Sequence, residues 1–166
     1  MVSTLLSKID RWLATNRPDY YASLQPGASE AALAAFEARF AIVLPAPFRE
    51  LYQWRNGQRA DCFESLQHNR MFSSLDDIAE TKDTLDGMIG FDFDDPEWWR
   101  RSWIPFLSNG GGDHLCVDLA AEDGGAAGQL IEFWHNDPGR PVTYPDLGAW
   151  LSDLALAMED GTLGVS

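Results

Sequence analysis

The spacing of apolar residues changes at about residue 60, and this change restricts the possible folds more than any other feature of the sequence. Before that point, apolar residues recur every three or four positions, as one face of a helix requires. After it, they form short runs separated by Gly, Asn, Asp and Pro, which is typical of strands joined by turns. Helices followed by strands in one chain predict an α+β fold.

The first third of the chain predicts three helices, each marked by start or stop signals. A serine before an apolar stripe can cap a helix by accepting a hydrogen bond from a free backbone N–H, and proline or Asn-Gly can end one. The expected helices are residues 4–15 with Ser3 as N-cap and an end before Pro18, a second from a Ser29 cap to before Leu44-Pro45, and a third from Pro47 to a left-handed stop at Asn56-Gly57.

The remainder predicts a sheet flanked by helices. Strand candidates are residues 70–72, 103–107, 114–119 and 129–135. Glycine-rich turns join the last three as an antiparallel meander. Ser74 can cap a short helix after the first strand, and apolar residues over 145–158 predict a C-terminal helix that covers one sheet face. The expected fold class is α+β, with N-terminal helices, a mostly antiparallel sheet of about four to six strands and a C-terminal helix packed on the sheet.

Size and charge limit the domain count and the partners. A chain of 166 residues fits one domain, so we expect a single domain over residues 1–166. The net charge is −14, from 12 Lys and Arg against 26 Asp and Glu, and such a field repels nucleic acid and anionic lipid. A basic protein is the partner that this charge favours. No apolar run is long enough for a membrane span or a signal peptide, so we expect a cytoplasmic protein.

Motifs that would support catalysis or a cofactor are absent from the sequence. Cys62 and Cys116 lack Cys-x-x-Cys spacing, and His68, His114 and His135 lack the spacing of metal-ligand pairs. The carboxylates of residues 92–97 are interrupted by a proline and lack the glycine of a calcium loop, which favours a solvated acidic loop over a metal site. We therefore predict no catalytic residues, no metal and no cofactor.

The most unusual segment follows that acidic run, where three tryptophans and two arginines lie within residues 98–103. Adjacent tryptophans in an extended chain cannot both point to one face, so at least one of them is expected near the surface. Two interpretations stay open: the segment packs on the core edge while its arginines pair with the neighbouring acids, or it binds a partner, since Trp and Arg are enriched in binding hot spots. The candidate partner-binding residues are Asp92, Asp94, Asp95, Glu97, Trp98 and Trp99.

Three stretches together resemble the SUKH superfamily of Smi/Knr-type cell-wall-assembly regulators and bacterial toxin-immunity proteins. Residues 37–57 are similar to its acidic residue, Leu-Pro and aromatic helix ending in Asn-Gly. Residues 103–119 resemble its strand, glycine loop and second strand ending in Asp, and residues 128–135 with Trp150-Leu151 resemble its last strand and closing segment. The acidic, Trp-rich residues 86–103 depart from this pattern.

The resemblance implies an α+β fold and a non-enzymatic, protein-binding role. Together with the acidic charge, it favours an immunity protein that neutralises a cognate, nuclease-like toxin with a basic surface, because an acidic protein can occupy a phosphate-binding groove. The alternative is a cytosolic scaffold or regulator of the cell-wall-assembly type. A hydrolase using the acidic loop is a distant third. The sequence leaves the toxin, the binding surface and the oligomeric state open.

Overall fold

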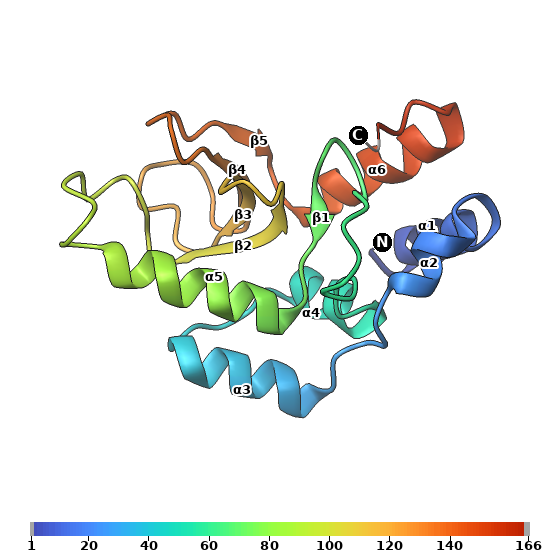
Figure 1. The fold of residues 1–166 in the computed structure, drawn as a ribbon, viewed down its shortest axis with the longest axis horizontal. Helices are drawn as coiled ribbons and strands as arrows, with labels where there is room; N and C mark the ends of the chain where they lie inside the picture. The colour runs from blue at the N-terminus through green and yellow to red at the C-terminus, as the bar shows by residue number, and fades with distance from the viewer. Residues whose placement is uncertain (1, 165–166) are drawn as a thin grey trace.

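The computed structural model describes residues 2–164, and it confirms the α+β fold class with six helices and one five-stranded sheet (Figure 1). In chain order the elements are α1 (Val2–Asn16), α2 (Pro18–Ser23), α3 (Glu30–Phe40), α4 (Ala46–Trp54), β1 (Met71–Phe72), α5 (Leu75–Met88), β2 (Trp103–Ser108), β3 (His114–Asp118), β4 (Gln129–Phe133), β5 (Val142–Tyr144) and α6 (Leu147–Asp160). No helix among these is long and apolar enough to cross a membrane.

The N-terminal helices follow the predicted signals with two differences. Ser29 caps α3 as expected, because its hydroxyl accepts a hydrogen bond from the Ala32 N–H at 3.0 Å. Ser3, however, lies inside α1 rather than before it, so the prediction that it caps this helix is wrong. Pro18 follows the end of α1 and is also the first residue of α2, a helix that was not predicted. At that position the missing N–H of proline breaks no helical hydrogen bond.

Asn56 and Gly57 have a different structural role from the predicted helix stop. The helix α4 already ends at Trp54, and Gly57 lies beyond it with φ of +67°. The Asn56 side-chain oxygen accepts a hydrogen bond from the Leu75 N–H at 2.9 Å, at the start of α5. A Cβ on Gly57 would lie 2.4 Å from the backbone nitrogen of Ser74. The turn therefore fastens the end of α4 to the start of α5.

The sheet is the expected meander, with strand order β1-β2-β3-β4-β5 and every neighbouring pair antiparallel. The predicted strands are confirmed with shifts of one or two residues at their ends. The strand β5 was not predicted, because Val142 and Thr143 are exposed and give no apolar alternation.

Both faces of the sheet are covered, which explains why β2 and β3 are buried almost throughout. Side chains alternate between faces along a strand. Leu115, Val117 and Leu130 belong to the large core shared with the helices, whereas Cys116 and Ile131 belong to a second, smaller cluster.

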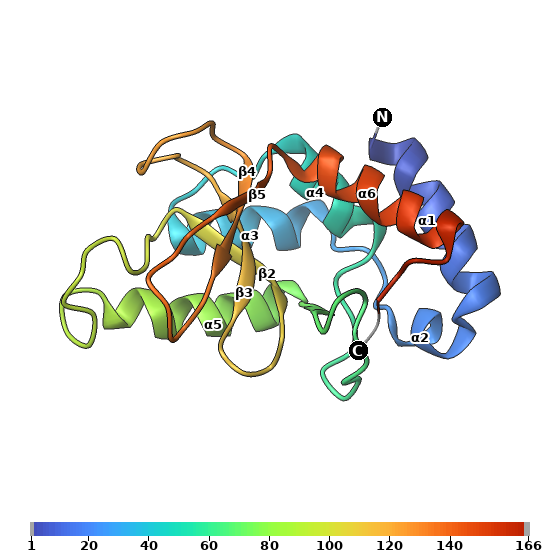
Figure 2. The ribbon, with the colours of Figure 1, turned by 90° about the horizontal axis from the view of Figure 1, so that it is seen from above.

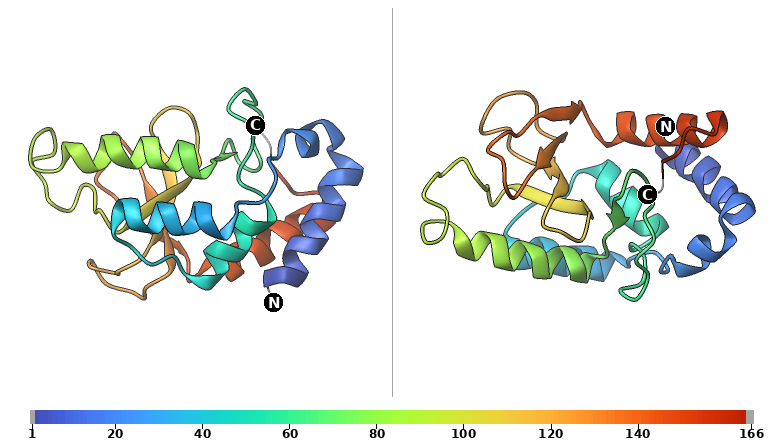
Figure 3. Two further views of the ribbon diagram at one scale, coloured as in Figure 1. Left: turned by 90° about the horizontal axis from the view of Figure 1, so that it is seen from below. Right: turned by 45° about the horizontal axis from the view of Figure 1, so that its top comes forward.

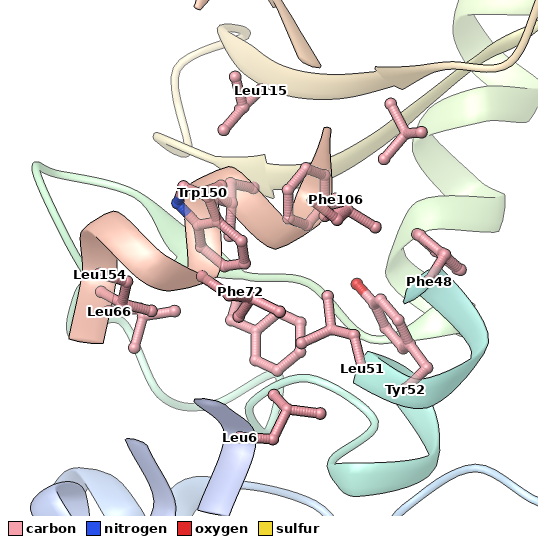
Figure 4. Close-up of a cluster of buried hydrophobic side chains, with 14 of the residues drawn as sticks. Leu6, Phe48, Leu51, Tyr52, Leu66, Phe72, Phe106, Leu115, Trp150 and Leu154 are labelled. Carbon is pink, nitrogen blue, oxygen red and sulfur yellow. The ribbon is translucent and has the colours of Figure 1, made fainter. Parts of the chain in front are cut away.

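The C-terminal helix α6 lies alongside α1 and meets the sheet at its N-terminal end (Figure 2). The indole of Trp150 contacts the ring of Phe106 in β2 edge to face, with ring centres 5.2 Å apart (Figure 4). The predicted contact between this helix and the sheet is present, and α1 is its larger partner.

The second face is covered by the C-terminal half of α5 and by residues 89–102, which form the lobe at the end of α5 in Figure 1. Its buried cluster consists of Trp99, Trp103, Cys116, Ile131 and Phe133. The helix α3 lies beside α5 on the outside, linked to it by the ion pair between Arg39 and Asp83 (Figure 3). The acidic, Trp-rich segment is thus part of the fold as well as part of the surface.

Candidate functional site

The structure places the six predicted site residues in one segment but not in one environment. The side chains of Asp92, Asp94, Asp95 and Glu97 are exposed, Trp98 is half-buried, and Trp99 is buried with 1% exposure. The prediction that at least one of the two adjacent tryptophans lies near the surface is confirmed for Trp98. Trp99 is therefore removed from the candidate binding surface, because a partner cannot contact it without unfolding the segment.

Trp99 instead anchors the segment to the sheet and to α5. Its indole packs edge to face against Trp103 and Phe133, with ring centres 5.4 Å and 5.2 Å apart. Its Nε1–H donates a hydrogen bond to Asp86 Oδ1 at 2.7 Å. For Trp99, the packing interpretation of the segment is the correct one.

A buried ion pair completes this anchor. Lys82 is 1% exposed, and its Nζ lies 2.9 Å from Asp86 Oδ2 and also donates to the Arg101 carbonyl oxygen. Burial lowers the pKa of Lys82, an effect that the Asp86 carboxylate opposes. Sequence reasoning missed this pair, although the i, i+4 spacing of the two residues was a usable signal.

Trp98 is held in place by Arg140. The guanidinium lies 4.7 Å from the Trp98 ring centre and 4.4 Å from that of Phe133, and it donates two hydrogen bonds to the Trp98 carbonyl, at 3.0 Å and 3.2 Å. Burial lowers the pKa of Arg140. The half-buried indole of Trp98 is therefore an ordered part of the surface.

The four carboxylates have no cationic partner among the described residues. The predicted pairing of the arginines with Asp94, Asp95 or Glu97 is wrong, because Arg100 pairs with Glu122 at 3.1 Å and Asp123 at 2.5 Å in another loop. The one hydrogen bond within the acidic run is local, from the Glu97 N–H to Asp95 Oδ1 at 2.8 Å. The acidic run therefore forms no ion pair among the described residues, although Glu97 and Asp95 interact electrostatically with Arg100 and Arg140 at longer range.

One aromatic residue of the segment was overlooked at the sequence level. Phe91 precedes the acidic run and is 83% exposed, the highest value among the exposed large apolar residues of the described chain. Phe93 is half-buried, with its ring centre 6.2 Å from that of Trp98. The place of Phe91 directly before the acidic run is visible in the sequence, but its exposure is not.

Between α5, this segment and the sheet lies a groove of about 470 Å³. Its walls come from Leu85 and Met88 of α5, from Phe93 and Trp98 of the segment, and from Phe133 of β4. We refer to it below as the α5 groove. The groove thus joins residues 81–98, from α5 and the segment that follows it, to Gly112, His114, Phe133 and His135 farther along the chain.

Two histidines also line the α5 groove, His114 from β3 and His135 from the turn after β4. His114 is 6% exposed, and burial lowers its pKa to about 4. Its Nδ1 has no hydrogen-bond partner in the structure of residues 2–164. His135 is exposed at the rim, where its ring nitrogen lies 2.7 Å from Asp113 Oδ1. The ring of His114 stacks on Phe133, with centres 6.1 Å apart.

Two acidic residues in the stretches that resemble the SUKH superfamily, Glu37 and Asp118, stabilise the fold rather than form a site. Glu37 accepts hydrogen bonds from the Leu44 N–H at 2.8 Å and from Arg49 at 2.9 Å, and the backbone bond is the main cause of its lowered pKa. Asp118 accepts hydrogen bonds from the Ala121 N–H and from Gln129, each at 2.9 Å, and so orders the loop after β3.

Within the described part of the chain, no group of three His, Cys, Asp or Glu side chains is arranged to hold a metal ion. Cys62 and Cys116 are free thiols, and burial raises the pKa of Cys116.

Two comparisons with known proteins bear on this chain. Residues 27–153 match the model of the SMI1/KNR4 family (SUKH-1). The chain is also similar to a glucan synthesis regulatory protein from Neurospora crassa, with 23% identity over 209 residues. That match covers 98% of this chain and 39% of the relative, so the chain spans about two-fifths of the length of the relative.

Proposed function

The chain belongs to the SMI1/KNR4 family (SUKH-1), and from that premise we propose that it is a non-catalytic, cytoplasmic protein-binding domain with a basic protein as its partner. One observation carries this proposal: the exposed carboxylates of residues 92–97, which form no ion pair among the described residues, adjoin the exposed Phe91 and the ordered, half-buried Trp98. Charge attracts a basic partner before contact, and aromatic side chains supply affinity after it.

The more favoured role is regulation or scaffolding. The relative that matches nearly the whole of this chain is named a glucan synthesis regulatory protein, and that name describes a regulator rather than an enzyme. A domain of this kind works by holding another protein, so it requires a binding surface and no catalytic group.

The second candidate role is immunity against a toxin. It is favoured by the net charge of −14, because a nuclease-like toxin needs a basic groove for its own substrate, and an acidic protein can occupy that groove. Both roles use the same acidic, aromatic surface. They differ in whether the partner protein is toxic when it is expressed without this chain.

Photocrosslinking tests the surface. A photoreactive phenylalanine analogue replaces Phe91 in one variant and Val43 in the control, since Val43 is equally exposed, at 82% against 83%, but lies outside the acidic segment. We expect a crosslinked partner protein from position 91 in the native host, none from position 43, and loss of the product when Asp92, Asp94 and Asp95 are changed to Asn. Equal products from both positions, or none from position 91, would contradict the proposal.

The crosslinked partner then separates the two roles. If its expression alone stops growth and co-expression of this chain restores growth, the chain is an immunity protein. If the partner is harmless alone, the regulatory role stands.

A further inference from the structure

We infer that the α5 groove receives an apolar side chain from a Lys- or Arg-rich segment of the protein partner. This inference rests on the proposed function and names the part of the surface that holds the partner.

The walls of the groove are suited to an apolar side chain. Leu85, Met88, Phe93, Trp98 and Phe133 supply aliphatic, thioether and aromatic surface around a volume of about 470 Å³. Such a pocket gains affinity by removing apolar surface from water, and ordered walls avoid part of the entropy cost of binding. Trp98 is ordered by its contacts with Arg140, so one wall is already in place.

The charge beside the groove selects the rest of the segment. Phe93 and Trp98 line the groove, and the chain between and around them carries the unpaired carboxylates of Asp92, Asp94, Asp95 and Glu97. The guanidinium of Arg140 lies over the Trp98 and Phe133 rings and donates to the Trp98 carbonyl, and its single positive charge offsets only one of the four negative charges. An incoming segment therefore meets net negative charge, which favours lysine or arginine on either side of the apolar residue.

His114 contributes a neutral part of the groove wall. It lines the groove with 6% exposure, and burial lowers its pKa to about 4. The neutral imidazole therefore adds no positive charge that would repel an entering lysine or arginine.

Short peptides of known sequence test the inference on the full chain. The probe is a blocked pentapeptide, Lys-Lys-Leu-Lys-Lys, and its controls replace the central leucine by serine or all lysines by glutamate. Methyl NMR follows Leu85 and Met88. With the leucine peptide we expect saturable shifts at the methyl groups of both residues. We expect about tenfold weaker affinity for the serine peptide, because the apolar anchor is lost, and no binding of the glutamate peptide.

A groove-filling variant provides the structural control. Thr84 is exposed on α5 and lines the groove, so Thr84→Trp places a large side chain in it from the surface. Thr4→Trp makes the same change on the exposed face of α1. We expect Thr84→Trp to weaken binding of the leucine peptide at least about tenfold, and Thr4→Trp to leave it unchanged.

The inference is overturned if the leucine peptide gives no saturable methyl shifts up to millimolar concentration, if the leucine and serine peptides bind equally, or if Thr84→Trp binds as well as the parent. Its failure is distinguishable from failure of the proposed function, because the crosslink from position 91 reports partner binding without the groove. If the crosslink from position 91 forms but the leucine peptide causes no methyl shifts at Leu85 and Met88, this inference is rejected and the proposed function is not.

Discussion

Gly57 shows how one residue without a side chain can join two helices. Its φ of +67° disfavours any Cβ, and a Cβ there would also lie 2.4 Å from the Ser74 nitrogen. Gly90 has a similar φ of +80° but open space around it. We expect Gly57→Ala to cost about 2 to 4 kcal/mol of unfolding free energy and Gly90→Ala about 1 kcal/mol, as measured by urea denaturation. Equal losses would mean that the close approach to Ser74 is unimportant.

His114 makes stability depend on pH. Burial lowers its folded-state pKa to about 4 from an ordinary value of 6.5, so the unfolded chain binds the proton first as the pH falls. The contribution of His114 is complete above about pH 6.5 and is lost progressively toward pH 4. Between pH 7.5 and pH 5 we expect the parent to lose about 2 kcal/mol more than His114→Gln, in denaturation curves at each pH. Parallel curves for the two proteins would contradict this expectation.

Trp98 and Trp99 are neighbours in sequence with opposite expected roles. Trp99→Ala removes a buried indole and a hydrogen bond to Asp86, so it should cost about 3 to 5 kcal/mol of stability. Trp98→Ala removes a half-buried ring and should instead speed dissociation of the partner protein that crosslinking identifies. The loss of binding free energy should be about 2 kcal/mol or more if Trp98 is a hot spot. Melting curves and binding kinetics on both variants check this; a stable Trp98→Ala protein with parental dissociation would exclude Trp98 from the interface.

At the scale of elements, a buried ion pair on α5 holds the acidic segment against the sheet. Asp86→Asn leaves the Lys82 ammonium buried without a countercharge, and we expect a loss of about 3 kcal/mol of stability in urea denaturation. The double variant Lys82→Met with Asp86→Asn should recover most of that loss, because no unpaired charge remains and the amide oxygen can still accept from Trp99. A double variant as unstable as the single one would contradict this assignment.

A surface ion pair serves as the control for the Lys82 and Asp86 variants. Lys8 and Glu159 join α1 and α6 with side chains about half exposed, at 46% and 53%. Since water and salt screen such a pair, Glu159→Gln should change stability by at most about 1 kcal/mol in the same assay.

Sequence patterns predicted the elements whose signals are local. The serine caps of α3 and α5 and the glycine turns of the meander act within a few residues, so their pattern is visible in the sequence. The helix α2 was missed because Pro18 stops one helix and starts another, and β5 because it is short and exposed.

The candidate site was predictable only in part for the same reason. The acids and Trp98 are conspicuous in one short segment, and the structure leaves them at the surface. The burial of Trp99 and the α5 groove depend on β3 and β4 as well as on α5, and these strands begin 15 and 30 residues after Trp99. No local pattern encodes contacts of that kind.

Over the whole molecule, the charge of −14 raises the question of whether the total or its placement governs association. A uniformly acidic surface attracts a basic partner in any orientation, whereas a local cluster also orients it. The acids of residues 92–97 are distinguished by their clustering, because four exposed carboxylates without an ion pair in the described structure lie within six consecutive residues. Removing these charges should therefore change the rate at which the partner associates.

The last prediction separates placement from total charge. Changing Asp92, Asp94 and Asp95 to Asn removes three negative charges from the segment, and changing Asp19 and Asp160 to Asn with Glu50 to Gln removes three exposed charges from other parts of the surface. We expect the first variant to associate more slowly with the partner protein that crosslinking identifies, and its association rate should depend less on ionic strength. The reason is that these charges act mainly before contact.

The control variant should keep most of the parental association rate, and neither variant should change the dissociation rate greatly, since Phe91 and Trp98 remain. Stopped-flow association at several salt concentrations measures both effects. Equal slowing of the two variants would show that total charge alone steers the partner, and the acidic segment would then have no special place in binding.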